Sequence, residues 1–112
     1  MTTQIDDMQV GDIGTRVIVT INDGVDPQTG IPIPRTAIST ASVMKLYFRK
    51  PGGVTIERDA ELLTDGSDAK IVYVTVSGDI DRKGTWSVQG YIQMPGWSGR
   101  SNIDTFPVGG NL

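Results

Sequence analysis

Apolar and polar side chains alternate along several short stretches of this chain, which is the pattern of half-buried β-strands. Met44, Leu46 and Phe48 alternate with basic and tyrosine side chains, for example, and the turn-forming residues 51–53 follow them. Comparable stretches predict strands over residues 16–21, 42–50, 54–62, 70–76, 85–94 and 100–108. The pattern therefore predicts an all-β fold of about six strands, arranged either as a β-sandwich or as a small barrel.

Residues 23–41 break this alternation. The prolines of the segment exclude a helix or a central strand, and a structureless connection of this length is uncommon in a compact domain. Ile31 and Ile33 alternate with two of the prolines, so we expect an edge or polyproline-like segment that forms a surface arm. Because these isoleucines have little to pack on locally, they are candidates for binding a neighbouring subunit. A bend further on is expected to bring Ile38 into the core.

The two ends of the chain lie outside the pattern. Residues 1–10 are predicted to form an N-terminal tail and residues 109–112 a loose C-terminal end, so that the folded domain comprises residues 11–108. Met8 and Val10 are among the few apolar residues of the tail. Both are candidates for binding a neighbouring subunit and becoming ordered on assembly, and a disordered terminus is the alternative.

Composition supports the β prediction and limits the chemistry. Isoleucine, valine and threonine are abundant, and their branched Cβ atoms suit a pleated sheet. The chain contains no histidine and no cysteine, which excludes an imidazole base, a thiolate nucleophile, a disulfide and a structural zinc site. We therefore expect a protein that is not an enzyme and that has no catalytic residue, cofactor or metal.

Charge and hydropathy exclude further classes of partner. The net charge is −3, there is no basic patch, and no apolar run is long enough to span a membrane. Neither nucleic acid nor a membrane is therefore an expected partner. Residues 1–12 are polar and acidic and lack the cationic start and apolar stretch of a signal peptide, so we expect synthesis in a cytoplasm.

The carboxylates of the chain allow two other interpretations. The 65–68 turn and the Asp79/Asp81 pair supply oxygen ligands for Ca²⁺, but their spacing does not fit an EF-hand loop, and aspartate is a frequent turn residue. Asp59 and Glu61 have the chemistry of the acid and base of a glycosidase. The alternation around them favours an exposed polar face instead.

The two tryptophans have different predicted roles. Trp86 is in phase with Val88 and Ile92, which favours core packing at a strand start, where its indole N–H would be the hydrogen-bond donor of a sandwich corner. Trp97 lies in a predicted hairpin tip and is interpreted either as an exposed interface anchor or as a cover over the end of the sandwich. A carbohydrate-binding surface formed by Trp97 and Tyr91 is a third interpretation.

Several motifs in a fixed order carry a resemblance to a known family. They are Gly11-Asp12-Ile13-Gly14-Thr15, Ile38-Ser39-Thr40-Ala41, Phe48-Arg49-Lys50-Pro51-Gly52, Asp79-Ile80-Asp81, Gly84-Thr85-Trp86 and Phe106-Pro107-Val108. Together they resemble the immunoglobulin-like N-terminal domain of the upper baseplate proteins of tailed bacteriophages, and related small phage tail proteins. The resemblance covers about residues 11–108.

This resemblance implies an immunoglobulin-like antiparallel β-sandwich of about six to seven strands. It implies a structural protein of the virion that docks onto other virion proteins in the tail, baseplate or neck, in multiple copies within a symmetric assembly. Larger members continue into host-binding regions, whereas this sequence ends at Leu112, so we expect an adaptor. A capsid decoration or head-fibre protein and a carbohydrate-binding module are the alternatives.

Overall fold

The fold consists of strands and the connections between them. The computed structural model describes residues 4–5, 8–35, 37–101 and 103–110, and within these ranges there is no helix. In chain order the strands are β1 (Gln4–Ile5), β2 (Met8–Gln9), β3 (Arg16–Thr20), β4 (Asn22–Val25), β5 (Pro32–Pro34), β6 (Val43–Arg49), β7 (Thr55–Asp59), β8 (Glu61–Leu62), β9 (Lys70–Val74), β10 (Gly84–Met94), β11 (Trp97–Arg100) and β12 (Asp104–Gly109). The predicted mainly-β fold is confirmed.

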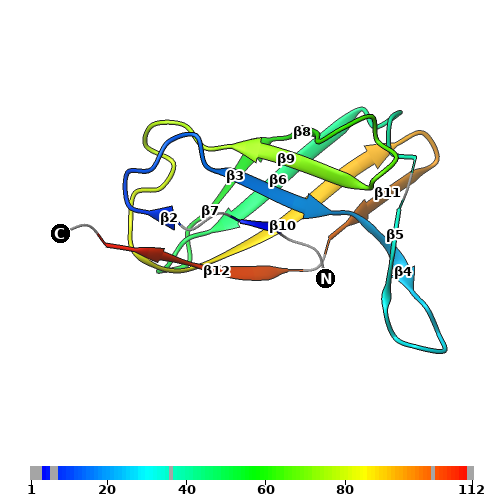
Figure 1. Cartoon of the computed structure of the whole chain (residues 1–112), viewed down its shortest axis with the longest axis horizontal. Coiled ribbons are helices and arrows are strands. Elements are labelled where there is room, and N and C mark those ends of the chain that lie inside the picture. The colour runs from blue at the N-terminus through cyan, green and yellow to red at the C-terminus, as the bar shows by residue number, and fades with distance from the viewer. Residues whose placement is uncertain (1–3, 6–7, 36, 102, 111–112) are drawn as a thin grey trace.

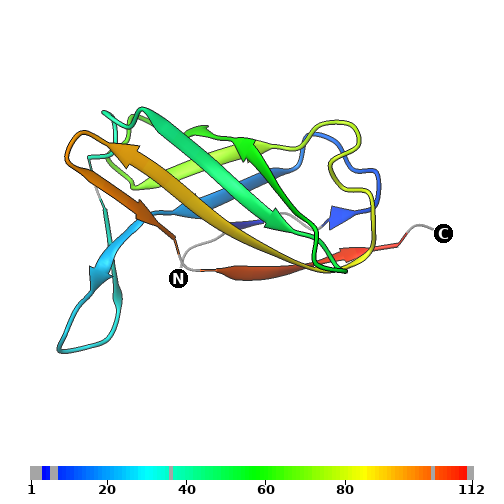
Figure 2. The same ribbon diagram turned by 180° about the vertical axis from the view of Figure 1, so that it is seen from behind.

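Two sheets form the body of the molecule, and a hairpin projects from it (Figure 1, Figure 2). The first sheet has the strand order β1-β3-β9-β8. The second has the order β2-β12-β10-β6-β7, with β11 as a further partner of β10, and β4 and β5 form the separate hairpin. Strand β2 runs parallel to β12. The expectation of an entirely antiparallel arrangement is therefore wrong at this edge, where the N-terminal segment completes the second sheet.

Of the residues predicted to form a tail, 4–5 and 8–10 belong to the body, and the others lie outside the described residues. Strand β1 pairs with β3 of the first sheet, and β2 pairs with β12 of the second. Met8 is only 4% exposed and lies in the core, and the N–H of Val10 donates to the carbonyl oxygen of Gly109 at 2.9 Å. The open edge of β12 and the core beneath it supply the local packing that the sequence pattern did not reveal.

A change of sheet also divides the strand that the alternation predicted over residues 54–62. Strand β7 pairs with β6 in the second sheet, whereas β8 pairs with β9 in the first. Ala60 lies between them, 8% exposed, and its N–H donates to the carbonyl oxygen of Met44 at 2.9 Å. The bend at Ala60 lets one continuous stretch of chain join the two sheets along one side of the body.

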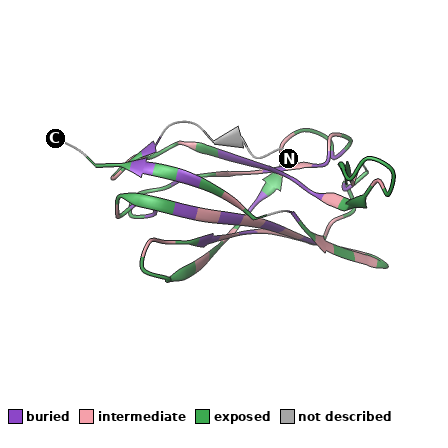
Figure 3. Cartoon of the chain, turned by 90° about the horizontal axis from the view of Figure 1, so that it is seen from below, coloured by how far each residue is buried: buried purple, intermediate pink, exposed green. Residues whose placement is uncertain are grey.

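The core lies between the two sheets, and buried residues alternate with exposed ones along the strands (Figure 3). Ile38 and Trp86 are both fully buried, which confirms the predictions made for them. Gly90 sits in the middle of β10, where a Cβ atom would lie 3.0 Å from Cγ1 of Val19 and 3.3 Å from Cδ1 of Ile21. Glycine at this position therefore lets the two sheets approach closely.

Ser101 bridges a gap in the hydrogen bonding of β10. The stretch predicted as one strand over residues 100–108 is in fact interrupted, because β11 ends at Arg100 and β12 begins at Asp104. At the interruption the buried hydroxyl of Ser101 accepts the N–H of Gly90 at 2.7 Å, and the N–H of Ser101 donates to the Gly90 carbonyl oxygen at 2.9 Å. The side chain replaces the ladder bond that a continuous neighbour strand would make.

Replacing Ser101 should therefore destabilise the domain. Ser101→Ala leaves the buried N–H of Gly90 without its acceptor, and we expect a loss of about 1–3 kcal/mol in the free energy of unfolding. Urea denaturation measures it. Ser98→Ala, at an exposed position of β11, is the matched control and should change stability by less than about 0.5 kcal/mol. Equal stability of the two variants would contradict the bridging role of Ser101.

Candidate functional site

The first candidate is a buried polar cluster around Asp79, in the crossing from β9 to β10. Its carboxylate accepts the N–H of Val76 at 2.9 Å and the Nε–H of Arg58 at 3.0 Å, and it also accepts a short hydrogen bond from the Tyr73 hydroxyl. Arg58 comes from β7 and Tyr73 from β9, so the cluster joins both sheets to the crossing. Asp79 itself is 5% exposed.

These contacts shift the pKa values of the three side chains. Burial raises the pKa of the Asp79 carboxyl, but the hydrogen bonds from Tyr73, Val76 and Arg58 outweigh it, so the net pKa is lower than the ordinary value. Burial, together with the Asp79 carboxylate, raises the pKa of the Tyr73 hydroxyl to about 12. Burial lowers the pKa of Arg58, but its bonds to Asp79 outweigh this and raise it. At neutral pH the cluster is an ion pair with a neutral phenol.

The same crossing is fixed at its other end by Trp86. The indole N–H donates to the carbonyl oxygen of Arg82 at 3.0 Å, as predicted for a corner at the start of this strand. Asp81 forms an ion pair with Lys50 at 2.8 Å, and the Lys50 ammonium lies 5.7 Å from the Trp86 ring centroid. The hydrogen bonds to Asp79, together with those of Trp86 and Lys50, thus hold the crossing in place, which is a structural role.

Asp79→Asn should weaken the domain in a pH-dependent way. Because the folded-state pKa of Asp79 is lowered, its charge contributes stability above the unfolded pKa of about 4, and this contribution is lost as pH falls through the folded pKa. We expect the variant to lose about 1–3 kcal/mol at pH 7 and the difference from the parent to shrink in acid. Asp59→Asn, on an exposed strand position, is the control. A difference that is constant between pH 7 and pH 3 would contradict this role.

The free energy of unfolding at alkaline pH should depend on Tyr73. Its folded-state pKa is raised to about 12, so its contribution is fully present below the unfolded pKa of about 10 and is lost as pH rises from there through about 12. Tyr73→Phe should be less stable than the parent at pH 8, and the deficit should diminish above about pH 10. Thermal denaturation across this range measures it, and an unchanged deficit at pH 11 would contradict it.

The second candidate is the hairpin of β4 and β5, which we call the arm (residues 22–34). It projects from the body in both views (Figure 1, Figure 2). Its tip is closed by backbone bonds, from the Asp26 N–H to the Ile31 carbonyl oxygen at 2.9 Å and from the Gly30 N–H to the Asp26 carbonyl oxygen at 2.7 Å. Three apolar side chains on it are largely exposed, Val25 at 57%, Ile31 at 62% and Ile33 at 45%.

The arm agrees with the surface arm expected from the prolines. Its first residues, 22–24, have the composition of a tight turn. They lie within β4 instead, and the pairing with β5 shifts register between Asn22 and Val25. The positive φ of Gly24, +76°, belongs to this irregularity. The chain therefore reverses further along, at the tip near Asp26.

Trp97 lies at the base of the arm. It is the first residue of β11, directly opposite Met94, and is not in the turn where the sequence pattern placed it. The guanidinium of Arg35 stacks on its ring at 4.6 Å from the centroid and forms an ion pair with Asp23 of the arm at 2.9 Å. The ring is half-buried and packs against the core, with the Cα of Gly99 beneath it, where any Cβ would collide. This geometry favours the interpretation in which Trp97 covers the end of the body over the interpretation in which it is an exposed anchor.

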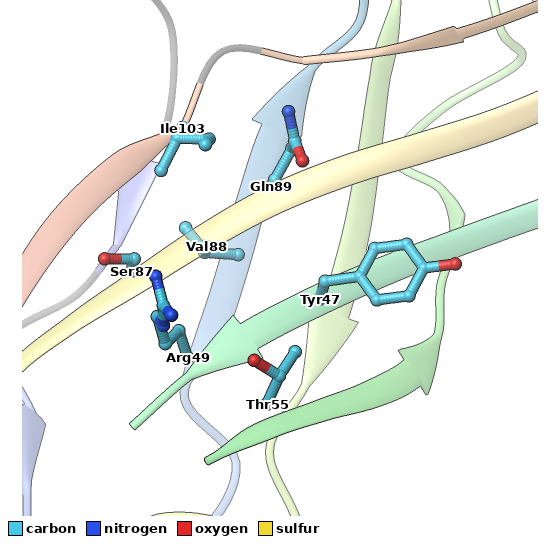
Figure 4. A pocket seen from close by; sticks show the side chains of 7 residues that line it. All are labelled: Tyr47, Arg49, Thr55, Ser87, Val88, Gln89 and Ile103. Atoms are coloured by element: carbon cyan, nitrogen blue, oxygen red, sulfur yellow. The ribbon is translucent and has the colours of Figure 1, made fainter. Parts of the chain in front are cut away.

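The third candidate is a hollow on the outer face of the second sheet, which we call the sheet groove (Figure 4). It has a volume of about 200 Å³ and is lined by Tyr47, Arg49, Thr55, Ser87, Val88, Gln89 and Ile103. Beside it, the guanidinium of Arg100 lies 4.8 Å from the ring centroid of Tyr91 and 5.4 Å from that of Tyr47.

The structure thus separates the residues that the sequence singled out for interaction. Ile31 and Ile33 share the arm, with Trp97 at its base, whereas Tyr91 lies on the outer face of the second sheet. Sequence reasoning missed Tyr47 and Arg49 as site residues. Both alternate with the apolar side chains of β6, so they lie on the face of the strand that points away from the core.

The carboxylate interpretations receive no support among the described residues. Within them, no three acidic side chains are grouped so as to hold a metal ion. The Asp65 carboxylate accepts both the N–H and the hydroxyl of Ser67, at 3.0 Å and 2.6 Å, which is turn chemistry and lowers its pKa. Asp59 and Glu61 are exposed and line a depression of about 240 Å³ with Val72, Tyr73 and Val74.

Comparison with known proteins adds no further identification. No family model, curated protein or solved structure matches this chain. In the part of the chain that the structure describes, no helix is long and apolar enough to cross a membrane.

Proposed function

We propose that this chain is an immunoglobulin-like structural module of a tailed-bacteriophage particle, located in the tail, baseplate or neck. It acts by binding other virion proteins and not by catalysis. The proposal rests on the motif resemblance, on the strand order and, above all, on the exposed apolar arm.

The strand order supports the immunoglobulin-like assignment. When the arm strands β4 and β5 and the extra partner β11 are left out of the lettering, the first sheet reads A-B-E-D and the second reads A′-G-F-C-C′. This is the order of an immunoglobulin sandwich with an extended second sheet. Trp86 opens the strand equivalent to F. Its bond to the Arg82 carbonyl oxygen takes the place of the bond that a tyrosine makes at the same corner.

The arm is the observation that carries the docking function. Val25, Ile31 and Ile33 are on a hairpin outside the core, where their side chains add nothing to the packing between the two sheets. Apolar side chains gathered on a projecting element are typical of an interaction site. Arg35 ties the arm to the body through Trp97 and Asp23, so the arm is held ready for its partner and loses little entropy on binding.

The proposal predicts that the chain is a particle component. Mass spectrometry of purified particles of the encoding phage should find it at a fixed stoichiometry, in tails separated from heads. Recovery with the heads alone would favour the capsid decoration or head-fibre alternative. Absence from both fractions would overturn the virion assignment.

A variant of the arm tests the docking surface directly. The triple change Val25→Ser, Ile31→Ser, Ile33→Ser should abolish incorporation into particles and leave the thermal unfolding of the isolated domain within about 0.5 kcal/mol per position. The control is Ile13→Ser with Val54→Ser, two apolar residues of comparable exposure outside the arm. Normal incorporation of the triple variant would contradict docking through the arm.

A further inference from the structure

We propose that the sheet groove binds a saccharide that carries a carboxylate group. The groove lies across β6 and β10 on the outer face of the second sheet, away from the core (Figure 4). Its volume of about 200 Å³ is comparable with a single sugar ring, and it opens to solvent, so that a longer saccharide can continue beyond it. This activity goes beyond the docking function and uses none of the residues of the arm.

The lining has the chemistry of a polyhydroxylated ligand site. Gln89 lies opposite Tyr47 and Ser87 lies opposite Arg49 in the pairing of β10 with β6. The Gln89 amide already donates one N–H to the carbonyl oxygen of Ser101 at 3.0 Å, which leaves its second N–H and its oxygen for a ligand. Hydroxyl and guanidinium groups donate to sugar oxygens, and the hydroxyls and the amide oxygen also accept from sugar hydroxyls. The ring of Tyr47 and the 65% exposed side chain of Ile103 offer apolar surface to the C–H faces of a sugar.

The charge on this face selects an acidic sugar. Among the described residues, no ion pair or hydrogen bond occupies the Arg49 guanidinium, whereas Arg58 and Arg82 are each paired with an aspartate. The Arg100 guanidinium contacts two tyrosine rings and forms no ion pair within the described part of the chain. A guanidinium fork matches a carboxylate with two parallel hydrogen bonds. Glu57, which lies opposite Tyr47 on this face, is paired with Lys45 at 3.4 Å. Arg49 and Arg100 are therefore the positive charges of this face that no described ion pair offsets, and they form the local site for an anion.

The position of the groove on the sheet disfavours an acidic peptide as the ligand. Peptides commonly bind a sheet by adding a strand to an open edge. The floor of the groove is β10, which pairs with β6 on one side and with β11 and β12 on the other, so its backbone groups are already used. A ligand here meets side chains alone, which suits a compact saccharide ring.

The experiment is a titration of the ¹⁵N-labelled chain, followed by NMR, with trigalacturonate and with disialic acid. At least one of the two should shift the amide signals of Tyr47, Arg49 and Gln89, and leave those of the arm unchanged. The methyl ester of trigalacturonate, which has the same sugar without charge, should bind at least about tenfold more weakly.

Two pairs of variants assign the binding to the groove. Arg49→Ala should weaken binding about tenfold or more, whereas Arg16→Ala, which removes an exposed arginine from β3 of the other sheet, should leave it within about twofold. Tyr47→Ala should lose about tenfold, whereas Tyr47→Phe keeps the ring and most of the affinity.

Four results would overturn the proposal, and the first three concern the saccharides and the arginine variants. They are the absence of shifts with both acidic saccharides, equal binding of the methyl ester, and equal losses for Arg49→Ala and Arg16→Ala. Tighter binding of a hexaglutamate peptide than of either saccharide would overturn it too, because the groove would then recognise acidic protein. Incorporation of Arg49→Ala into particles is a separate readout of the docking function and should be normal.

Discussion

The rest of the structure depends on the buried carboxylate of Asp79, because a charge in that position needs donors from several parts of the chain at once. The donors to this carboxylate are Arg58 from β7 of the second sheet, Tyr73 from β9 of the first sheet, and the N–H of Val76 in the crossing itself. Apolar contacts between two sheets tolerate small displacements, whereas a buried hydrogen-bonded charge does not. The hydrogen bonds to Asp79 therefore link the two sheets and the crossing to one another at this point.

Strand β10 connects the core to the outer face of the second sheet. Trp86 anchors its beginning at the same crossing, Gly90 brings its centre close to the first sheet, and Ser101 completes its hydrogen bonding where β11 gives way to β12. Residues of β10 alternate between the core and the outer face, so the position of Gln89 in the sheet groove is fixed by the packing of Val88 beneath it. The packing of β10 against the core therefore fixes the floor of the groove, which lowers the cost of ordering that part of the site when a ligand binds.

The sequence alone predicts the elements whose alternation is uninterrupted. Strands β6 and β10 lie where the pattern places them, and Trp86 is buried with its indole N–H on a backbone carbonyl because it shares the phase of Val88. The change of sheet at Ala60 escapes prediction, since the residue keeps the apolar phase through the bend. Met8 escapes it because its strand pairs with β12, at the far end of the chain, and periodicity carries no information about distant partners. The groove unites residues of four separate segments, each of which looks like an ordinary solvent face.

The arm and the sheet groove share no residue, and this separation has a consequence for a multivalent particle. If the arm fixes many copies in a symmetric assembly, the grooves of those copies face the same array of ligands together. A single shallow groove with a few polar contacts binds a saccharide weakly, but linked copies raise the overall avidity by about 10²–10⁴ without any new contact. Weak binding by the isolated domain is then no obstacle to a function at the surface of a particle. In the assembly that we propose, docking through the arm sets the number of copies, and the sheet groove of each copy makes the contacts with the saccharide.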